Sequence, residues 1–519
     1  MTSRDSAAPF SAPVAPGRPP DDQEREERSA KVLFVASECV PYAKTGGLAD
    51  VVAALAKTLQ QKGCEVRVIL PLYGTITPEE HGIEFARSAC VHMGGGVEQW
   101  VGIHSTKLAG RVPVWFVDYK VYFDRPGLYG DSHGEYGDNG FRFALFCKAA
   151  IQLCKDTGFI PDVIHAHDWQ GALAPAFLKT WDRYGSPVSG TASVLTIHNI
   201  GYQGICLPGV FPYIGVGYEH FTPERFEWYG NVNLLKAGIY FADALTTVSP
   251  THADEILGAE GGMGLAGALR VRRNDLTGIL NGVDYEHWDP ATDALIPANY
   301  GPDNLDGKRT CRRALQETYG LPVRDDLPVF GMVARLVQQK GVNLLREALP
   351  RAFDELEFQL VLLGTGEPDN EEFFRWLAAA YPDRAGCRIG YSEALSHLVE
   401  AGSDFFLMPS LYEPCGLNQI YSMKYGTLPI VHAVGGLADT VENYTPESGD
   451  GTGFTFQVPA AEAFYRVLCL AMATWYEQPD HIARLRQTAM SRNFSWDQAA
   501  EKYVEVYRRA VDNRRIPAI

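Results

Sequence analysis

The chain has 519 residues, more than one ordinary hydrophobic core organises, so at least two domains are expected. Its net charge of −17 argues against nonspecific binding to nucleic acid or to an anionic membrane surface, and no apolar run approaches the roughly 20 residues that cross a bilayer. The ten cysteines lack the paired short spacings of a zinc site or a disulfide framework, which predicts a reduced, cytoplasmic protein.

Residues 1–29 differ in composition from the rest of the chain. They are rich in Pro, Ala and Ser and become densely charged from Asp21 to Arg28. This composition predicts a disordered N-terminal tail rather than a secretion signal or a transit peptide.

From Lys31 onward, short β-branched runs alternate with stretches such as Phe141–Lys155 that have helical spacing of apolar residues. This alternation predicts a parallel sheet with helices on both faces, and we assign residues 30–285 to a first Rossmann-like domain. Its predicted strands are Val32–Ala36, Val66–Leu70, Val112–Val117, Asp162–Ala166, Ser193–His198 and Ala244–Ser249.

A Pro- and Asp-rich break separates this domain from a second one. The alternation resumes with Val329–Ala334, Phe358–Leu363 and Phe405–Pro409, and we assign residues 286–495 to a second Rossmann-like domain. The last helix begins at Trp496, after that sheet is complete, so residues 496–519 are expected to return to the first domain. The predicted fold class is α/β, with two Rossmann-like domains facing each other across a cleft and ligands at the carboxyl ends of strands.

Two nearly identical Gly-Gly segments, Gly46–Asp50 and Gly435–Asp439, each lie between a predicted strand and a predicted helix. Glycines there let backbone N–H groups face a ligand beside the positive end of the helix, although tight packing alone also requires glycine. The first copy is preceded by a cation, Lys44, which a packing turn does not need. It is predicted to bind phosphate.

Two further cations, Arg335 and Lys340, follow the strand Val329–Ala334. Standing alone they would be interpreted as solvated surface charges. Their position at the carboxyl end of a strand favours a phosphate site instead, with Arg as a planar fork and Lys as a compact charge.

The segment Glu413–Gln419 follows the strand Phe405–Pro409 and leads into a short helix. Its amides could cap a phosphate while Glu413 accepts hydrogen bonds from a sugar; the alternative role for Glu413 is an acid at a helix N-terminus. Cys415 invites a nucleophile hypothesis, but no histidine base lies nearby in the sequence, so it is interpreted as a small neighbour of the substrate.

His165 and His167 could share one face of a strand, as metal ligands do, but no third ligand with suitable spacing accompanies them. Asp168 and Trp169 are better suited to sugar hydroxyls and sugar faces. No two aspartates are separated by a single residue, so the metal-binding Asp-x-Asp signature of many sugar-nucleotide enzymes is absent. Lys44, Arg335 and Lys340 must therefore supply the positive charge, and no metal or other cofactor is expected.

Together, these segments resemble the bacterial glycogen synthases and plant starch synthases. The resemblance covers essentially everything from residue 30 onward, and Ala49, where plant enzymes commonly carry glycine, favours the bacterial branch. The motifs that carry it are KTGGLAD (44–50), DRPG (124–127), HAHDW (165–169), HN (198–199), LNGVD (280–284) and EPCGL (413–417).

The resemblance implies the GT-B architecture and transfer of glucose from ADP-glucose to the non-reducing end of an α-1,4-glucan such as glycogen, with retained configuration. It places His198 beside the anomeric carbon, with Arg335, Lys340 and Glu413 as the other catalytic residues. It implies acceptor contacts from Asp50, Tyr129 and Asp168. Donor contacts fall on Lys44, Gly47, Asn281, Tyr391 (stacking on adenine), Cys415, Gly416 and Leu417.

Two alternative functions remain. One is a glucosyltransferase of the same fold acting on a lipid or small acceptor, which the acidic chain disfavours because such enzymes usually carry basic, apolar membrane-facing helices. The other is a catalytically inactive glucan-binding or regulatory protein. The simultaneous presence of Lys44, His198, Arg335, Lys340 and Glu413 counts against it, because binding alone would not require them all.

Overall fold

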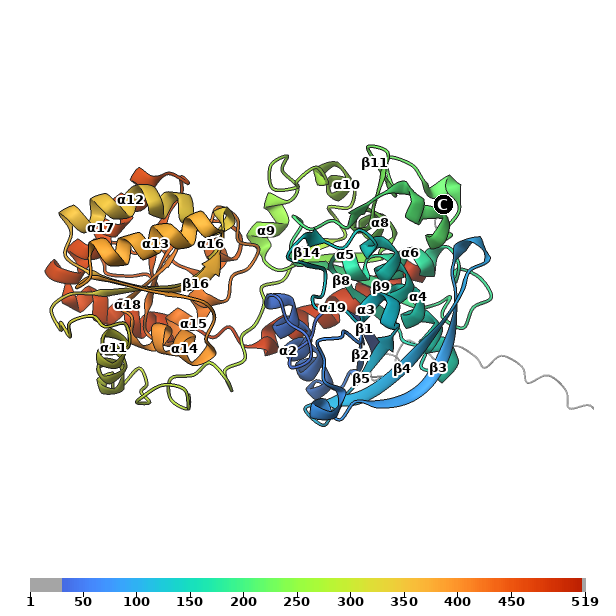
Figure 1. Cartoon of the computed structure of the whole chain (residues 1–519), viewed down its shortest axis with the longest axis horizontal. Helices are drawn as coiled ribbons and strands as arrows, with labels where there is room; N and C mark the ends of the chain where they lie inside the picture. The colour runs from blue at the N-terminus through green and yellow to red at the C-terminus, as the bar shows by residue number, and fades with distance from the viewer. Residues whose placement is uncertain (1–29, 516–519) are drawn as a thin grey trace, which may run out of the picture.

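The structure, a computed structural model, describes residues 30–515. The tail predicted at residues 1–29 lies outside the described residues. Figure 1 shows two α/β domains side by side, the first coloured blue to green and the second yellow to red. Within residues 30–515, no helix has both the length and the apolar character that crossing a membrane requires, and none of the ten cysteines is paired in a disulfide.

The first domain is built on a nine-stranded sheet with the order β14-β13-β9-β8-β1-β2-β5-β4-β3. Strands β14 to β5 are mutually parallel, and β4 and β3 add antiparallel pairs at one edge. The strands are β1 (Lys31–Val35), β2 (Glu65–Pro71), β3 (Glu84–His92), β4 (Glu98–Leu108), β5 (Val112–Asp118), β8 (Val163–His167), β9 (Ala192–Ile197), β13 (Ala244–Thr247) and β14 (Leu276–Gly278).

Helices and short strands complete this domain. The helices are α2 (Gly47–Gln61), α3 (Lys120–Phe123), α4 (Asn139–Thr157), α5 (Asp168–Gly171), α6 (Leu173–Lys179), α7 (Phe211–Ile214), α8 (Leu234–Phe241), α9 (Pro250–Glu255) and α10 (Ala266–Val271). The short strands are β6 (Gly130–Asp131), β7 (Gly134–Glu135), β10 (Ile205–Cys206), β11 (Glu227–Trp228) and β12 (Asn231–Asn233).

The second domain has a fully parallel six-stranded sheet with the order β17-β16-β15-β18-β19-β20. Its strands are β15 (Val329–Leu336), β16 (Gln359–Gly366), β17 (Ala385–Ile389), β18 (Phe405–Met408), β19 (Leu428–His432) and β20 (Phe454–Phe456). Its helices are α11 (Asp306–Thr318), α12 (Val342–Glu355), α13 (Pro368–Ala380), α14 (Glu393–Gly402), α15 (Asn418–Lys424), α16 (Gly435–Thr440), α17 (Ala461–Glu477) and α18 (Pro479–Ser491).

The predicted fold class is confirmed, because both domains have a central sheet of parallel strands alternating with helices. The predicted strands agree with the observed ones to within two residues at each end, except that β16 continues three residues beyond the predicted end at Leu363. The strands missed include the edge pair β3 and β4: the first five residues of β3 are exposed, so no continuous apolar run marks it.

The chain crosses between the domains twice, and the two crossings lie side by side. Val283 donates its backbone N–H to the carbonyl of Phe494 (2.8 Å), and the Phe494 N–H is donated to the Tyr285 hydroxyl (3.0 Å). A Cβ on Gly282 would lie 2.6 Å from the Trp496 Cα, so this approach requires glycine. The crossings therefore form one paired connection.

The last helix, α19 (Trp496–Arg515), packs against β9 and α2 of the first domain, where it is the red helix among blue and green elements in Figure 1. It buries Trp496, Tyr503 and Tyr507 in that domain's core. The Tyr507 hydroxyl also contacts Nδ1 of the buried His165 (2.9 Å). The first domain's core is thus completed by the end of the chain.

Candidate active site

A cavity of about 190 Å³ opens at the carboxyl ends of β15 and β18. These neighbouring strands are where the strand order of the second sheet reverses, the position at which doubly wound sheets bind ligands. Its lining, all from the second domain, is Met332, Val333, Ala334, Arg335, Lys340, Leu407, Met408, Ser410, Glu413, Gly416, Leu417 and Asn418.

The charged residues of this cavity are arranged asymmetrically. Lys340 Nζ lies 2.5 Å from Glu413 Oε2, which also accepts a hydrogen bond from the Ser410 hydroxyl (2.9 Å). Arg335 is exposed and has no side-chain hydrogen bond or ion pair with any residue between 30 and 515. The cavity therefore holds one guanidinium that is free to bind an anion, next to a cation positioned by a largely buried carboxylate.

The Cys415–Leu417 segment forms the wall beside Glu413. Cys415 is buried against Asn281, and burial raises the pKa of its thiol to about 12. A thiol with such a pKa is not a nucleophile at neutral pH, which supports its interpretation as a small neighbour. The Asn281 Oδ1 atom is buried and has no hydrogen-bond partner among residues 30–515.

The two Gly-Gly turns differ in their surroundings. A Cβ on Gly435 would lie 2.0 Å from the Glu413 carbonyl oxygen, and one on Gly436 would lie 2.0 Å from the Cys415 carbonyl oxygen. The second turn therefore needs glycine to pack against the Glu413–Cys415 loop. Around Gly46 there is open space, and near Gly47 the nearest atom to such a Cβ is Leu417 Cδ1 at 3.9 Å. The first turn leaves room for a ligand beside the cavity.

Glu38, which the sequence analysis did not single out, organises the loop before α2. Its buried carboxylate accepts hydrogen bonds from the backbone N–H and hydroxyl of Thr45 (2.6 Å each) and from the Gly46 N–H (3.3 Å). The Tyr129 hydroxyl, 91 residues away in the sequence, donates to the same carboxylate (2.7 Å). Glu38 thereby fixes both the loop at Thr45 and Gly46 and the side chain of Tyr129.

Lys44 and Asp50 form an ion pair at 2.9 Å on the surface of this loop. Both side chains are partly exposed, so the pair stabilises the fold by at most about 1 kcal/mol. Lys44 can therefore exchange its partner for a phosphate at little cost.

His198 and Asp168 lie at the ends of β9 and β8, and β8 adjoins β1 where the order of the first sheet reverses. Asp168 Oδ1 accepts the backbone N–H groups of His198 (2.7 Å) and Asn199 (3.3 Å). His198 Nε2 lies 3.0 Å from His167 Nδ1, and burial lowers the pKa of His198 to about 3. His198 is thus a neutral imidazole held in place by Asp168.

The expectation that Trp169 contacts sugar faces is wrong. Its side chain is buried against Phe143 and Tyr129, with ring centroids 4.9 and 6.3 Å away. It packs the core beneath the site. Tyr391, assigned to adenine, is 76% exposed at the end of β17 and does not line the cavity.

Asp168 provides a test that depends on pH. Burial raises its pKa from 3.8 to about 7, so between these values the folded chain holds a proton that the unfolded chain has lost. Stability from this group is lost as the pH rises through that window. In Asp168→Asn, the side-chain amide oxygen can still accept the two backbone N–H groups, and asparagine tolerates the φ of 52° observed at this position.

We expect this variant to gain stability relative to the wild type as the pH rises from about 4 to 7, by up to about 1.4 kcal/mol per pH unit. Urea unfolding of both proteins across this range measures the difference. A difference that is constant with pH would contradict the assignment.

The candidate residues thus form two groups. The structure brings Arg335, Lys340, Glu413, Gly416 and Leu417 together in one cavity, with Cys415 and Asn281 behind its wall. The first-domain group comprises Lys44, Gly47, Asp50, Tyr129, Asp168 and His198, and Gly47 approaches Leu417 across the domain boundary.

Residues 31–271 match the family described as the starch synthase catalytic domain, and residues 319–490 match glycosyl transferases group 1. The chain is 48% identical over 485 residues to glycogen synthase 1 of Geobacter sulfurreducens, covering 93% of this chain and 97% of that protein. It is 45% identical over 490 residues to glycogen synthase of Treponema denticola, covering 93% and 99%.

Among solved structures, it resembles the catalytic domain of starch synthase IV from Arabidopsis thaliana bound to ADP and acarbose. The TM-score is 0.85 and the identity 34%, covering 93% of this chain and 100% of that one.

Proposed function

The chain belongs to the family of bacterial glycogen synthases and plant starch synthases, and on this premise we propose how it works. It is a glycosyltransferase with the function of a glycogen synthase. The proposed reaction transfers glucose from ADP-glucose to the non-reducing end of an α-1,4-glucan, with retention of the anomeric configuration. No metal ion takes part in the proposed transfer.

The observation that best supports this proposal is that one cavity holds both the Lys340–Glu413 ion pair and Arg335, whose side chain has no partner among residues 30–515. Charge develops on the departing diphosphate, so fixed cations stabilise the transition state more than the ground state. Lys44 and the amides near Gly47 complete the proposed diphosphate site from the first domain. Asn281 and the Cys415–Leu417 wall would hold the glucose, and Tyr391 would stack on adenine.

The anomeric configuration is proposed to be retained because the acceptor hydroxyl attacks the same face of the glucose from which the diphosphate leaves. Glu413 already accepts from Lys340 and Ser410, so it is a poor candidate for a covalent nucleophile. The leaving phosphate oxygen would take the proton of the acceptor hydroxyl. The neutral His198 and the backbone carbonyl beside it would face the oxocarbenium-like glucose, while Tyr129 and Asp50 would contact the glucan.

One assay tests this function against its alternatives. The purified chain is incubated with glycogen and with labelled ADP-glucose, UDP-glucose or GDP-mannose, and label in the polymer is counted. Incorporation from ADP-glucose is the expected result. No incorporation from any donor would favour the inactive binding protein, whereas label in a small or lipid acceptor alone would favour the other transferase.

The two domains are expected to close when ADP binds. The proposed diphosphate site is divided between Lys44 and Gly47 on one side and Arg335 and Lys340 on the other, so neither domain completes it alone. Hinges are expected at residues 281–289 and 494–496, in the paired connection, and closure would exclude water that hydrolyses the donor. Small-angle scattering should show a smaller radius of gyration with saturating ADP. An open apo form whose radius does not change would contradict this hinge.

Transfer activity is expected to survive exhaustive chelation. The charge on the departing diphosphate is proposed to be neutralised by protein cations, and the chain lacks the Asp-x-Asp signature. The rate with EDTA is compared with the rate after addition of Mg²⁺ or Mn²⁺. Loss of activity under EDTA that either ion restores would overturn the metal-free phosphate site.

A further inference from the structure

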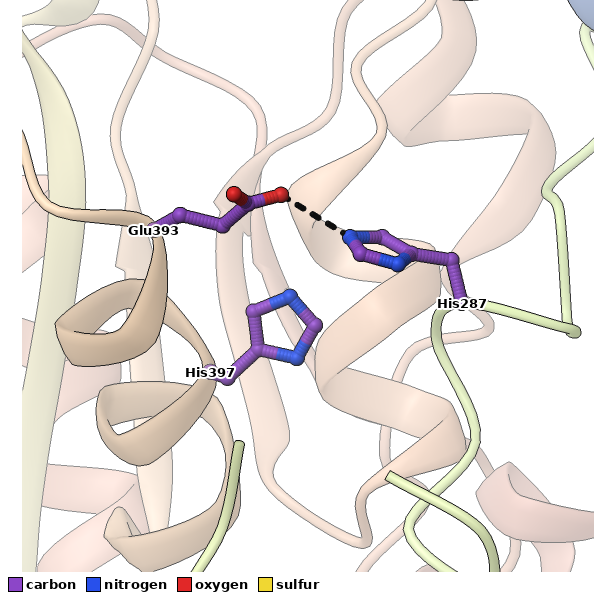
Figure 2. A group of neighbouring side chains, drawn as sticks. All are labelled: His287, Glu393 and His397. Carbon is purple, nitrogen blue, oxygen red and sulfur yellow. Dashed lines mark hydrogen bonds and ion pairs between the residues drawn. The ribbon is translucent and has the colours of Figure 1, made fainter. Parts of the chain in front are cut away.

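Three side chains meet at a site separate from the cavity: His287 from the connection between the domains, and Glu393 and His397 from α14 (Figure 2). Each offers one ligand atom, and these atoms all lie within 4.8 Å of one another. None of the three lines the cavity or has a role in the proposed transfer.

Helix α14 sets the positions of Glu393 and His397. They are four residues apart, so they lie on the same face of the helix one turn from each other. The helix start is fixed by Ser392, whose hydroxyl accepts the Leu395 N–H (3.3 Å). Two ligands are therefore presented by one rigid element.

His397 is arranged as a metal ligand rather than as an ordinary core histidine. Its Nδ1 lies 2.7 Å from Asp293 Oδ2, which also accepts the Tyr425 hydroxyl (2.6 Å). Because a carboxylate of this kind accepts hydrogen bonds, the proton resides on Nδ1 and the lone pair on Nε2. The His397 side chain is fully buried, and Nε2 has no hydrogen-bond partner among residues 30–515. Figure 2 shows this nitrogen facing the space between Glu393 and His287.

His287 is held against this pair by its neighbour in the chain. The Trp288 ring is stacked between those of His397 (3.8 Å) and Tyr421 (4.0 Å), which fixes the backbone at residue 287. His287 Nε2 then lies 3.0 Å from Glu393 Oε1. Two ligands of a tetrahedral zinc ion, each at about 2.0–2.1 Å from the metal, would be about 3.3 Å apart. The His287–Glu393 pair already has this spacing, and the other pairs, all within 4.8 Å, would need to approach by at most about 1.5 Å.

We propose that His287, Glu393 and His397 bind one zinc ion per chain, with solvent completing a tetrahedral shell and Asp293 orienting His397 from behind. Two imidazoles and one carboxylate suit zinc, whereas magnesium and calcium require oxygen ligands. The ion joins the connection between the domains to α14. None of its three ligands lines the cavity of the proposed transfer, so chelation is expected to remove the ion without stopping the chemistry.

The test uses the full chain, stripped of metal by dialysis against a chelator and titrated with ZnCl₂ by calorimetry. We expect one zinc per chain with a micromolar or tighter Kd. His287→Ala and Glu393→Gln remove exposed ligands and should each weaken binding at least tenfold, the effect of losing part of a metal site. Cobalt titration should give the visible absorption of a tetrahedral ion in the wild type and lose it in both variants.

His133→Ala is the matched control. His133 also pairs with a carboxylate on the surface, Asp131 at 3.2 Å, but no buried third ligand joins them among residues 30–515, so its removal should leave zinc affinity unchanged. The metal-free melting temperatures of the variants, compared with that of the wild type, show that each is folded. Absence of zinc binding, or binding that either ligand variant leaves unchanged, overturns the site. Zinc binding retained by the ligand variants would indicate that another group binds the ion, such as one of the ten cysteines.

Discussion

Arg335→Ala is expected to lower kcat by about a hundred- to a thousandfold, the usual effect of removing one group that stabilises charge in a transition state. Its guanidinium lines the cavity and has no partner among residues 30–515, so the variant should keep the wild-type melting temperature. Lys44→Ala should behave alike, since its ion pair with Asp50 is exposed. Single-turnover rates with ADP-glucose measure the loss of catalysis, and thermal unfolding shows whether stability has changed.

Lys340→Ala is expected to differ from these two variants. It leaves the Glu413 carboxylate, only 8% exposed, without its cation, and an unpaired buried charge costs about 3–5 kcal/mol. This variant should lose both activity and stability. Arg313→Ala, on the exposed face of α11, is the control and should change neither. Near-wild-type turnover of Arg335→Ala would show that the diphosphate is bound elsewhere.

Alanine substitutions in the two Gly-Gly turns are expected to have opposite consequences for stability and activity. Gly436→Ala places a Cβ 2.0 Å from the Cys415 carbonyl oxygen, a backbone atom that cannot move aside, so a loss of about 3 kcal/mol or more is expected. Gly47→Ala meets nothing closer than 3.9 Å and should leave stability unchanged. Its methyl group would nevertheless occupy the proposed diphosphate side of the turn. Displacing a substrate by about 1 Å lowers the rate on the order of a hundredfold.

Gly267→Ala is the matched control for both, because a Cβ there meets no atom within 4 Å and the residue is far along the chain from either turn. Unfolding and turnover are measured on all three variants. Gly47→Ala with full activity would mean that the first turn does not bind the diphosphate.

The sequence predicted those features of the fold and of the site that depend on local residue patterns. The apolar runs marked most parallel strands, and the carboxyl-end rule predicted that Arg335, Lys340 and Glu413 lie at one site, as they do. Contacts between distant residues could not be read in this way. Glu38 is one acidic residue among 63 acidic positions until the fold brings it to Thr45 and Tyr129. Likewise, His287 meets Glu393 and His397 only because Trp288 stacks in the second domain.

The position of α19 reverses the usual order in which domains complete their folding. Domains generally fold in the order of synthesis, N-terminal first. Here the second domain is in effect inserted into the first, whose core lacks Tyr503, Tyr507 and the rest of α19 until the last residues are made. The second domain, with its sheet complete by residue 456, has all its strands while the first still exposes the groove for α19. A chain truncated before Trp496 would therefore have all the strands of the second domain but a first domain that lacks its closing helix.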